Sequence, residues 1–432
     1  MDLETMALIG ILAVVVLVII GIPIAYSMLI MAIVIILFGL QQPASLLKLG
    51  TAPFSAFYSM TWAPLPLFIL MAYIIDQTTI AKDIFAAANK WLSRVPGGLV
   101  VSGIVGEAIM AAAIGSSGVT MLAVGKVALP EMEALHYKKD FSLGALLAGG
   151  VLGPLIPPSI PFVVYGILVQ QDIGKLLIAG IMPGILLTVL LATLATVLCI
   201  KHPSWAPLPP TVSWRERFVS ARKVWPIIII ILAIIGSIYL GIATASEAAG
   251  VGVLVTLILA VIGYGFRPRH LGKAMAATAT LTGMIGLMII SATIFTFAIG
   301  ISGLAQSISN SIVNAGLSPW VVIIAINIVI IIAGCIMDTL AIILVAVPIF
   351  VPLIMALGFD PIWFGVVMVV NTEIGLITPP IGLNTFLASQ VFEMPIYHVL
   401  RGVLPFLILL FVFLAIVIAF PQLSLWLPGL MD

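Results

Sequence analysis

The segment Gly153-Pro-Leu-Ile-Pro-Pro158 recurs 222 positions later as Gly375-Leu-Ile-Thr-Pro-Pro380. The same offset aligns Gly180-Ile-Met-Pro183 with Gly402-Val-Leu-Pro405 without a gap. Coincident glycine and proline residues at one constant offset are improbable in a background of leucine, isoleucine and valine. The sequence therefore predicts an internal duplication in which each half carries a Gly/Pro break inside an apolar stretch.

The duplicated segments lie in a chain that is apolar and poor in charge. Of 432 residues, 63% are apolar and 8% are charged, against about 45–50% and about 25% in soluble globular proteins. Uncharged runs that reach the roughly 18–20 residues needed to span a bilayer cover residues 5–40, 49–75, 141–171, 176–200, 224–246, 248–266, 274–337, 339–359 and 402–431. This pattern predicts an all-α polytopic membrane protein.

The same composition argues against several other classes of protein. The net charge is +1 and no basic block occurs, so nucleic-acid binding is not expected. No GxxxxGK[ST] loop is present, which argues against ATP hydrolysis by that route. Cys199 and Cys335 lie in apolar stretches, so we expect neither a disulfide nor a metal cluster nor another cofactor.

Basic residues indicate that the two halves have opposite orientations. Residues 82–94 and 136–140 carry Lys and Arg, whereas the equivalent stretches of the second half, 304–317 and 358–361, carry none. Short cytoplasmic loops are enriched in Lys and Arg, so equivalent loops with opposite bias should lie on opposite sides of the membrane. The duplication is therefore expected to be inverted, as in many secondary transporters.

Two re-entrant hairpins are predicted, one in each half. The stretch between Arg94 and Lys138 has basic ends, and Gly115-Ser-Ser-Gly118 interrupts it midway. Each arm is too short for a tilted span, so the tip should stop inside the membrane, where it must be buried in protein or line a cavity. The mirror copy covers residues 319–356. Broken helices are expected over 141–171 and 363–391, and a single inward span over 53–76.

Polar residues gather where the tips and the breaks should meet. Hydroxyl, amide and backbone oxygens at such places suit a small hard cation, and Na⁺ is the expected occupant. The first cluster comprises Ser116, Ser117, Thr120, Pro157, Pro158 and Ser159, and the second comprises Asp338, Thr339, Asn371, Thr372, Glu373, Thr378, Pro379, Pro380 and Asn384.

Three carboxyl groups in these stretches invite more than one interpretation. Asp338 has no Lys or Arg nearby in the sequence, so it should bind a cation or a proton; the alternative is a cap on a half-helix. Glu373 precedes the second break and could instead cap or face water. Glu107 and Lys126 flank Ser117 at matching depth, which predicts an ion pair that clamps the hairpin arms.

The Gly-Ser-Ser-Gly tip also matches the GxSG signature of intramembrane serine proteases. That chemistry needs a histidine in a transmembrane helix as general base. All four histidines lie in short polar connections, so the protease remains a remote alternative and no catalytic residue is expected.

Four segments of the sequence resemble one known family, and the resemblance covers nearly the whole chain. They are Pro64-Leu-Pro-Leu-Phe-Ile-Leu70, Gly153-Pro-Leu-Ile-Pro-Pro-Ser-Ile-Pro161, Gly334-Cys-Ile-Met-Asp-Thr-Leu-Ala341 and Asn371-Thr-Glu-Ile-Gly-Leu-Ile-Thr-Pro-Pro-Ile-Gly-Leu-Asn384. They are similar to the large membrane subunit of tripartite ATP-independent periplasmic (TRAP) transporters. The resemblance implies an inverted-repeat elevator transporter of the ion-transporter type in the bacterial inner membrane. It would import an organic anion, such as a dicarboxylate or sialic acid, with Na⁺ as the coupling ion.

The resemblance also implies partners and site residues. The expected partners are a small four-helix membrane subunit and a periplasmic substrate-binding protein. The expected sodium-binding residues are Ser116, Ser117, Thr120, Gly153, Pro157, Asp338, Thr339, Asn371, Thr378 and Pro379, and the expected substrate-binding residues are Ser116, Pro158, Ser159, Thr372, Pro380 and Asn384. Lys126 stands where the family is usually uncharged, which leaves a role in substrate choice open beside the ion pair.

An elevator of this kind divides the chain into seven parts. We expect scaffold helices over 1–81, a cytoplasmic arm helix over 82–98, half of a transport domain over 99–200, a cytoplasmic linker over 201–223, scaffold helices over 224–302, a periplasmic-side arm helix over 303–318 and the second transport half over 319–432. Two alternatives of similar fold stay open. One is a divalent-anion/Na⁺ symporter that needs no binding protein, and the other is a Na⁺/H⁺ antiporter that uses Asp338 and Glu373.

Overall fold

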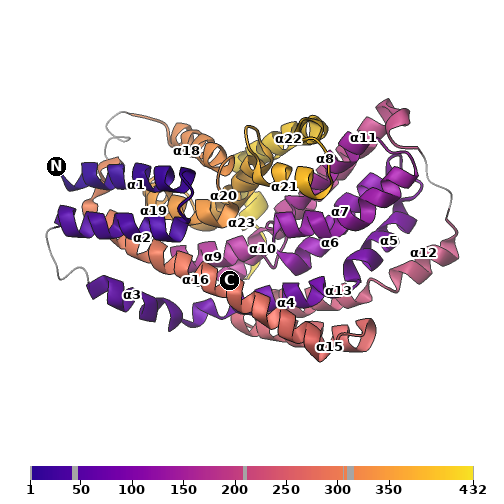
Figure 1. Ribbon diagram of the computed structural model, residues 1–432, viewed down its shortest axis with the longest axis horizontal. Coiled ribbons are helices and arrows are strands. Elements are labelled where there is room, and N and C mark those ends of the chain that lie inside the picture. The colour runs from indigo at the N-terminus through magenta and orange to yellow at the C-terminus, as the bar shows by residue number, and fades with distance from the viewer. Residues whose placement is uncertain (1, 41–46, 208–211, 305, 309–315, 432) are drawn as a thin grey trace.

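A computed structural model describes residues 2–40, 47–207, 212–304, 306–308 and 316–431, and all regular elements within these ranges are helices. Most of the helices run obliquely along the long axis of the molecule, with the N-terminal pair at one end (Figure 1). Five helices of the described part are long and apolar enough to cross a membrane, or seven if each of two bent pairs is one span. The chain is therefore a multi-pass helical membrane protein.

The first scaffold segment is more interrupted than expected. Its helices are α1 (Leu3–Ile19), α2 (Ile24–Val34) with a π-helical extension (Ile35–Leu40), α3 (Leu47–Phe57), a 3-10 turn (Met60–Trp62) and α4 (Pro64–Asp76). The prediction of one span over 53–76 was wrong. Ser59 caps the 3-10 turn by accepting from the Thr61 N–H, and Pro64 then starts a new helix because its ring disfavours continuation from the preceding turn.

The arm helix of the first half turns away from the span before it. α5 (Ile80–Leu92) is bent by 69° from the segment that ends at Asp76. Its Ile84 and Phe85 side chains are buried, whereas Lys82 and Trp91 are exposed. The Trp91 indole N–H donates to the Arg217 carbonyl over 3.1 Å, which ties the arm to α12 (Trp214–Ala221) within the predicted linker.

Both predicted hairpins and both broken helices are present. The first hairpin joins α6 (Gly98–Ile114) to α7 (Ser117–Ala134), and the second joins α18 (Pro319–Gly334) to α19 (Thr339–Ala356). The first broken helix consists of α8 (Lys139–Gly150) and α9 (Ile160–Val169), and the second consists of α20 (Pro361–Ile377) and α21 (Leu383–Val391).

The remaining helices complete both halves. They are α10 (Ile173–Ala179), α11 (Ile181–Lys201), α13 (Trp225–Ile231), a π-helical turn (Leu232–Gly236), α14 (Ser237–Tyr239), α15 (Ala245–Tyr264), α16 (Pro268–Ser302), α22 (Ile396–Ala419) and α23 (Gln422–Leu425), with 3-10 turns at Pro203–Trp205 and Pro428–Leu430. Half of the arm helix predicted over 303–318, residue 305 and residues 309–315, falls outside the described residues.

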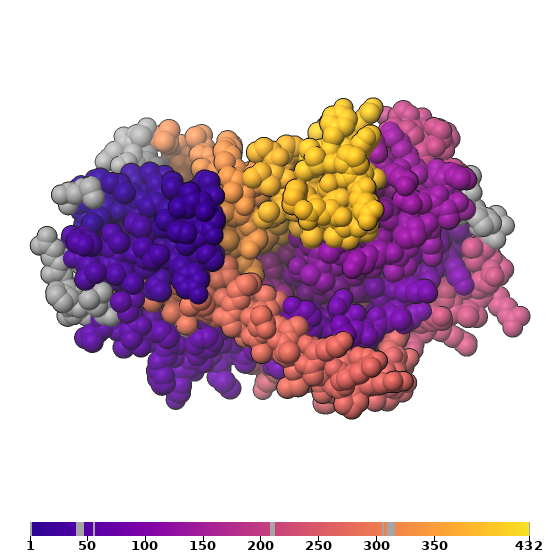
Figure 2. All heavy atoms as spheres, in the orientation of Figure 1, coloured from indigo at the N-terminus to yellow at the C-terminus, as the bar shows by residue number. Residues whose placement is uncertain are grey.

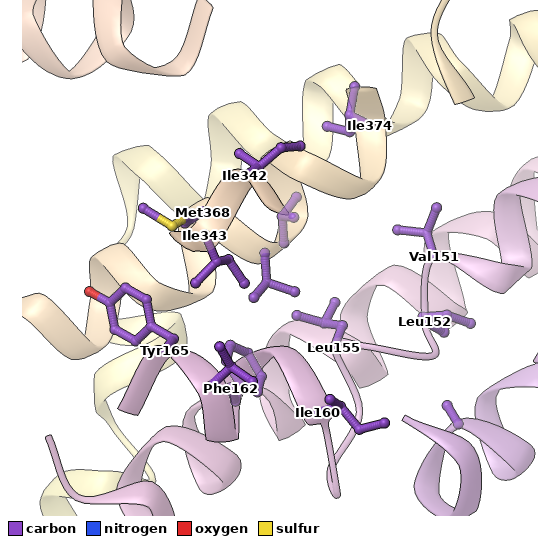
Figure 3. Packing of buried hydrophobic residues seen from close by; sticks show 14 of the residues in the cluster. Val151, Leu152, Leu155, Ile160, Phe162, Tyr165, Ile342, Ile343, Met368 and Ile374 are labelled. Carbon is purple, nitrogen blue, oxygen red and sulfur yellow. The ribbon is translucent and has the colours of Figure 1, made fainter. Parts of the chain in front are cut away.

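The two halves share one core. Phe162 and Tyr165 of α9 face Ile342 and Ile343 of α19, with Met368 of α20 beside them (Figure 3). The Tyr165 hydroxyl also donates to the Pro361 carbonyl over 2.6 Å. The C-terminal helices lie directly on helices of the first half (Figure 2).

One contact between the halves is made by backbone alone. Gly144 of α8 lies so close to Gly402 of α22 that a Cβ on either residue would collide with the opposite main chain. Two glycines at a helix crossing allow this approach. We call the contact the Gly144–Gly402 seam.

Candidate functional site

Glycines bring each hairpin tip against its broken helix. A Cβ at Gly153 would lie 2.7 Å from the Ser116 carbonyl oxygen, and one at Gly115 would lie 2.6 Å from the Pro158 carbonyl oxygen. Gly115 also has φ +70°, which favours glycine. In the second half, a Cβ at Gly375 would lie 2.6 Å from the Gly334 Cα. Side chains are thus excluded where backbone polar groups of tip and break meet.

Asp338 caps the helix that follows the second tip. Its Oδ1 accepts from the Ala341 N–H over 2.7 Å, so the capping interpretation of this carboxylate is confirmed. The residue is exposed and lines a cavity rather than being buried as expected. Cation binding by Asp338 is compatible with this position and stays a prediction.

Glu373 is the buried carboxylate of the site. Only 1% of the residue is exposed, and its Oε1 accepts from the Thr339 hydroxyl over 2.7 Å. The Oε2 atom has no hydrogen-bond partner among the described residues. The suggestion that Glu373 merely caps or faces water is therefore wrong, because it joins the second tip to α20 from inside the protein.

Another hydrogen bond at the site connects the first half of the chain to the second. The Asn384 amide Nδ2 at the start of α21 donates to the Ser117 hydroxyl at the start of α7 over 2.9 Å. The first tip therefore meets the second broken helix across the duplication. The two predicted polar clusters form one site.

The joined tips border a cavity of about 550 Å³. Of the predicted residues, Ser116, Ser117, Asp338, Thr339, Glu373 and Asn384 line it. The opposite wall consists of scaffold residues, including Tyr73 and Asp76 of α4 and Leu281 of α16. The cavity therefore lies between the two parts that an elevator would move relative to each other.

Other predicted residues lie behind this lining. Ser159 is buried and accepts from the Phe162 N–H over 3.3 Å as the cap of α9. Asn371 is buried and donates to the Asn327 carbonyl over 3.0 Å. The remaining members of the predicted sets that are outside the described cavity lining are Thr120, Gly153, Pro157, Pro158, Thr372, Thr378, Pro379 and Pro380. These positions support the tips and breaks, and their predicted ligand contacts stay untested.

Tyr73 and Asp76 were missed by the sequence reasoning. Asp76 ends an uncharged run and is the last residue of α4. A carboxylate at a helix C-terminus is opposed by the helix dipole. That mismatch is the signal that could have identified it.

The predicted ion pair between Glu107 and Lys126 is wrong. Glu107 is fully buried, and neither carboxyl oxygen has a hydrogen-bond partner in the part of the chain that the structure describes. Its carboxyl group packs against Gly149 of α8 instead. Lys126 is exposed on α7. The two side chains leave the hairpin in different directions because their helix faces differ.

The described lining is largely apolar, and its charged side chains are all acidic. It contains Asp76, Asp338 and Glu373 but, among the described residues, no Lys, Arg or His. Carboxylate, hydroxyl and carbonyl oxygens are the ligands that hard cations prefer. Hairpin tips and broken helices around such a cavity, in a multi-pass helical protein, define a membrane transport protein.

Comparison with known proteins identifies the family. Residues 11–423 match the tripartite ATP-independent periplasmic transporter, DctM component, and the chain belongs to this family. It is 38% identical over 400 residues to the C4-dicarboxylate TRAP transporter large permease protein DctM of Pseudomonas aeruginosa, with 92% of each chain covered. It is 30% identical to the sialic acid TRAP transporter large permease protein SiaM of Vibrio cholerae, with 95% of each covered.

Further relatives extend the comparison to another substrate and to solved structures. The ectoine TRAP transporter large permease protein TeaC of Halomonas elongata is 32% identical, with 84% of this chain and 85% of that one covered. The structure of the Alcanivorax borkumensis YdaH transporter has a TM-score of 0.64 at 15% identity, with 90% of each chain covered. This last likeness concerns the fold alone.

Membership of the family decides between the broad classes. The chain is a large permease subunit of a TRAP transporter, and its relatives are transporter components rather than enzymes. The serine-protease alternative is therefore wrong, and Gly115-Ser-Ser-Gly118 is the tip of the first hairpin.

Proposed function

We propose that this subunit imports an organic anion across the bacterial inner membrane, coupled to Na⁺, by an elevator movement. A periplasmic binding protein would deliver the anion, and a small four-helix membrane subunit would complete the complex. A carboxylate such as a dicarboxylate or sialic acid fits the relatives named above. The observation that carries the proposal is the single cavity formed by Thr339, Glu373, Ser117 and Asn384 from both halves.

The charge of that cavity supports the proposal of sodium coupling. Like charges disfavour one another at short range in a medium of low dielectric constant. An anion therefore gains little from a cavity that already holds Asp338 and Glu373. Bound Na⁺ would offset these charges, complete the tips and allow the anion to enter. Binding of cation and anion would then be thermodynamically coupled.

The position of the cavity supports the proposal of an elevator movement. Its lining divides between tips and breaks on one side and α4 and α16 on the other. The hairpins and broken helices share a core and the Gly144–Gly402 seam, so they are suited to move as one body. Sliding of that body past α4 and α16 would carry the site from one membrane face to the other.

Proteoliposomes test these points directly. The chain and its small subunit would be reconstituted, and uptake of dicarboxylates, sialic acid and ectoine measured with and without an inward Na⁺ gradient and the cognate binding protein. We expect uptake only when both are present. Uptake with Na⁺ alone would support the simple symporter, and Na⁺-driven proton movement without any anion would support the antiporter.

A further inference from the structure

Lys126 has no partner among the described residues, in a protein that has few charges. Within the described part of the chain its ammonium group makes neither a hydrogen bond nor an ion pair, and the residue is exposed. Charged residues at intramembrane hairpins are expected to serve a function by default. Since Glu107 does not pair with it, another role is needed.

Lys126 lies one helical turn beyond the last α7 residue of the described cavity lining. Gly118, Val119 and Leu122 of α7 line the cavity, and Lys126 follows Leu122 by four residues on the same helix face. Four residues advance a helix by about 6 Å. Helical side chains lean towards the N-terminus, and the flexible stem of a lysine is long enough to cover one helical turn, so Lys126 is within reach of the cavity although it is outside the described lining.

The helix α21 lies alongside α7 between the first tip and Lys126. A Cβ at Gly118 would lie 3.3 Å from both Asn384 and Leu387 of α21, and one at Gly125 would lie 2.7 Å from the Phe392 ring. α21 and α7 are thus neighbours (Figure 1), and Phe392 at the end of α21 reaches Gly125, the residue before Lys126. Along α7, Lys126 lies beyond the cavity-lining residues in the direction of Lys138 and Lys139. The distribution of basic residues predicts that this side is cytoplasmic.

The charge of the lining gives this position its importance. Asp76, Asp338 and Glu373 contribute carboxylates to the cavity, and the described lining contains no basic side chain. A carboxylate ligand therefore finds its nearest protein cation along α7 at Lys126. A lysine ammonium binds carboxylates as a mobile point charge with three donors.

We propose that Lys126 is a substrate-binding residue that holds a carboxylate of the transported anion at the cytoplasmic mouth of the cavity. This inference rests on the proposed function. A ligand with two carboxylates would reach Lys126 with one group while the other meets the tips and their Na⁺. Lys126 would thereby favour dianions over monoanions of similar size.

Counterflow in proteoliposomes tests the role of Lys126. Vesicles that contain the chain and its small subunit would be loaded with increasing concentrations of unlabelled succinate. Uptake of labelled succinate, with Na⁺ and the cognate binding protein outside, would be measured for wild type, Lys126→Met, Lys126→Arg and Lys201→Met. Lys201 is an exposed cation at the end of α11 and is outside the described cavity lining. If wild type does not carry succinate, the anion found in the uptake assay replaces it.

We expect Lys126→Met to raise the half-saturating internal concentration about tenfold, the scale of losing a hydrogen bond to a charged group, while the maximal rate changes little. Lys126→Arg should restore most of the affinity, and Lys201→Met should match wild type. The loss should be smaller for a monocarboxylate. Thermal unfolding in detergent checks that all variants fold.

The outcomes separate the two proposals. Failure of wild type to exchange any anion with Na⁺ would refute the proposed function. Normal exchange by wild type together with unchanged affinity in Lys126→Met would overturn only the role of Lys126. An equal loss for mono- and dicarboxylates, without recovery in Lys126→Arg, would also overturn it and indicate a structural role.

Discussion

The Thr339 hydroxyl donates to Glu373 Oε1 over 2.7 Å, and both residues are buried. This bond joins the first residue of α19 to α20 four residues before it ends. It therefore fixes the second tip against the helix that breaks beside it.

Thr339→Val tests the bond without changing the size of the side chain. Removing the donor leaves Glu373 Oε1 buried without its partner, which costs about 1–3 kcal/mol. We expect a lower unfolding temperature in detergent and a smaller stabilisation by NaCl over KCl, because bound Na⁺ stabilises only the folded state. Thr280→Val on the exposed side of α16 is the control. Equal NaCl stabilisation in Thr339→Val and wild type would contradict the assignment.

Asp338→Asn separates capping from cation binding. Asparagine caps a helix about as well as aspartate, so the bond to the Ala341 N–H and the unfolding temperature should be preserved. The loss of charge should raise the Na⁺ concentration for half-maximal uptake about tenfold, the scale of losing a charged partner. Transport by Asp338→Asn with unchanged Na⁺ dependence would show that this carboxylate takes no part in coupling.

Gly153→Ala tests the approach of tip and break. The added Cβ would lie 2.7 Å from the Ser116 carbonyl oxygen, which is backbone and has little freedom to move. We expect uptake to be abolished, with a lower unfolding temperature. Gly250→Ala is the matched control, because nothing lies within 4 Å of a Cβ there and alanine favours helix by about 1 kcal/mol. Wild-type uptake by Gly153→Ala would refute the tight-tip geometry.

Glu107→Gln tests whether Glu107 lacks an ion-pair partner. A buried carboxylate without a partner is costly, and removing its charge should relieve that cost. We expect an unfolding temperature equal to or above that of wild type. Had Glu107 formed an ion pair, the same change would have cost about 3–5 kcal/mol. A large drop in unfolding temperature for Glu107→Gln would therefore support the interpretation that Glu107 forms an ion pair.

The duplication, both hairpins and both breaks could be predicted because glycine and proline mark them locally. The positions of Gly153 and Gly375 mattered most, since the structure uses each for the approach of a tip. The interruption between α3 and α4 was missed because an apolar run hides it, although Pro64 stands at the new helix start.

The rotation of each helix could not be read from spacing alone. Glu373 was placed correctly beside the second break, but its inward orientation depends on how α20 packs, with Gly375 against Gly334 and the Glu373 carboxylate against Thr339. Glu107 and Lys126 have matching depth, but helix rotation separates them. Asp76 lies far from the tips in sequence, and its place in the cavity is set by how α4 packs.

The Gly144–Gly402 seam has a practical consequence for spectroscopy. At Gly144 and Gly402 the two helices touch through their main chains, so no flexible side chain separates them there. A pair of spin labels on α8 and α22 should therefore report one constant spacing in every state of the cycle. A pair that joins α8 to α4 should report two spacings. The α8–α22 distance would thus be a constant internal reference for measuring how far α8 moves relative to α4.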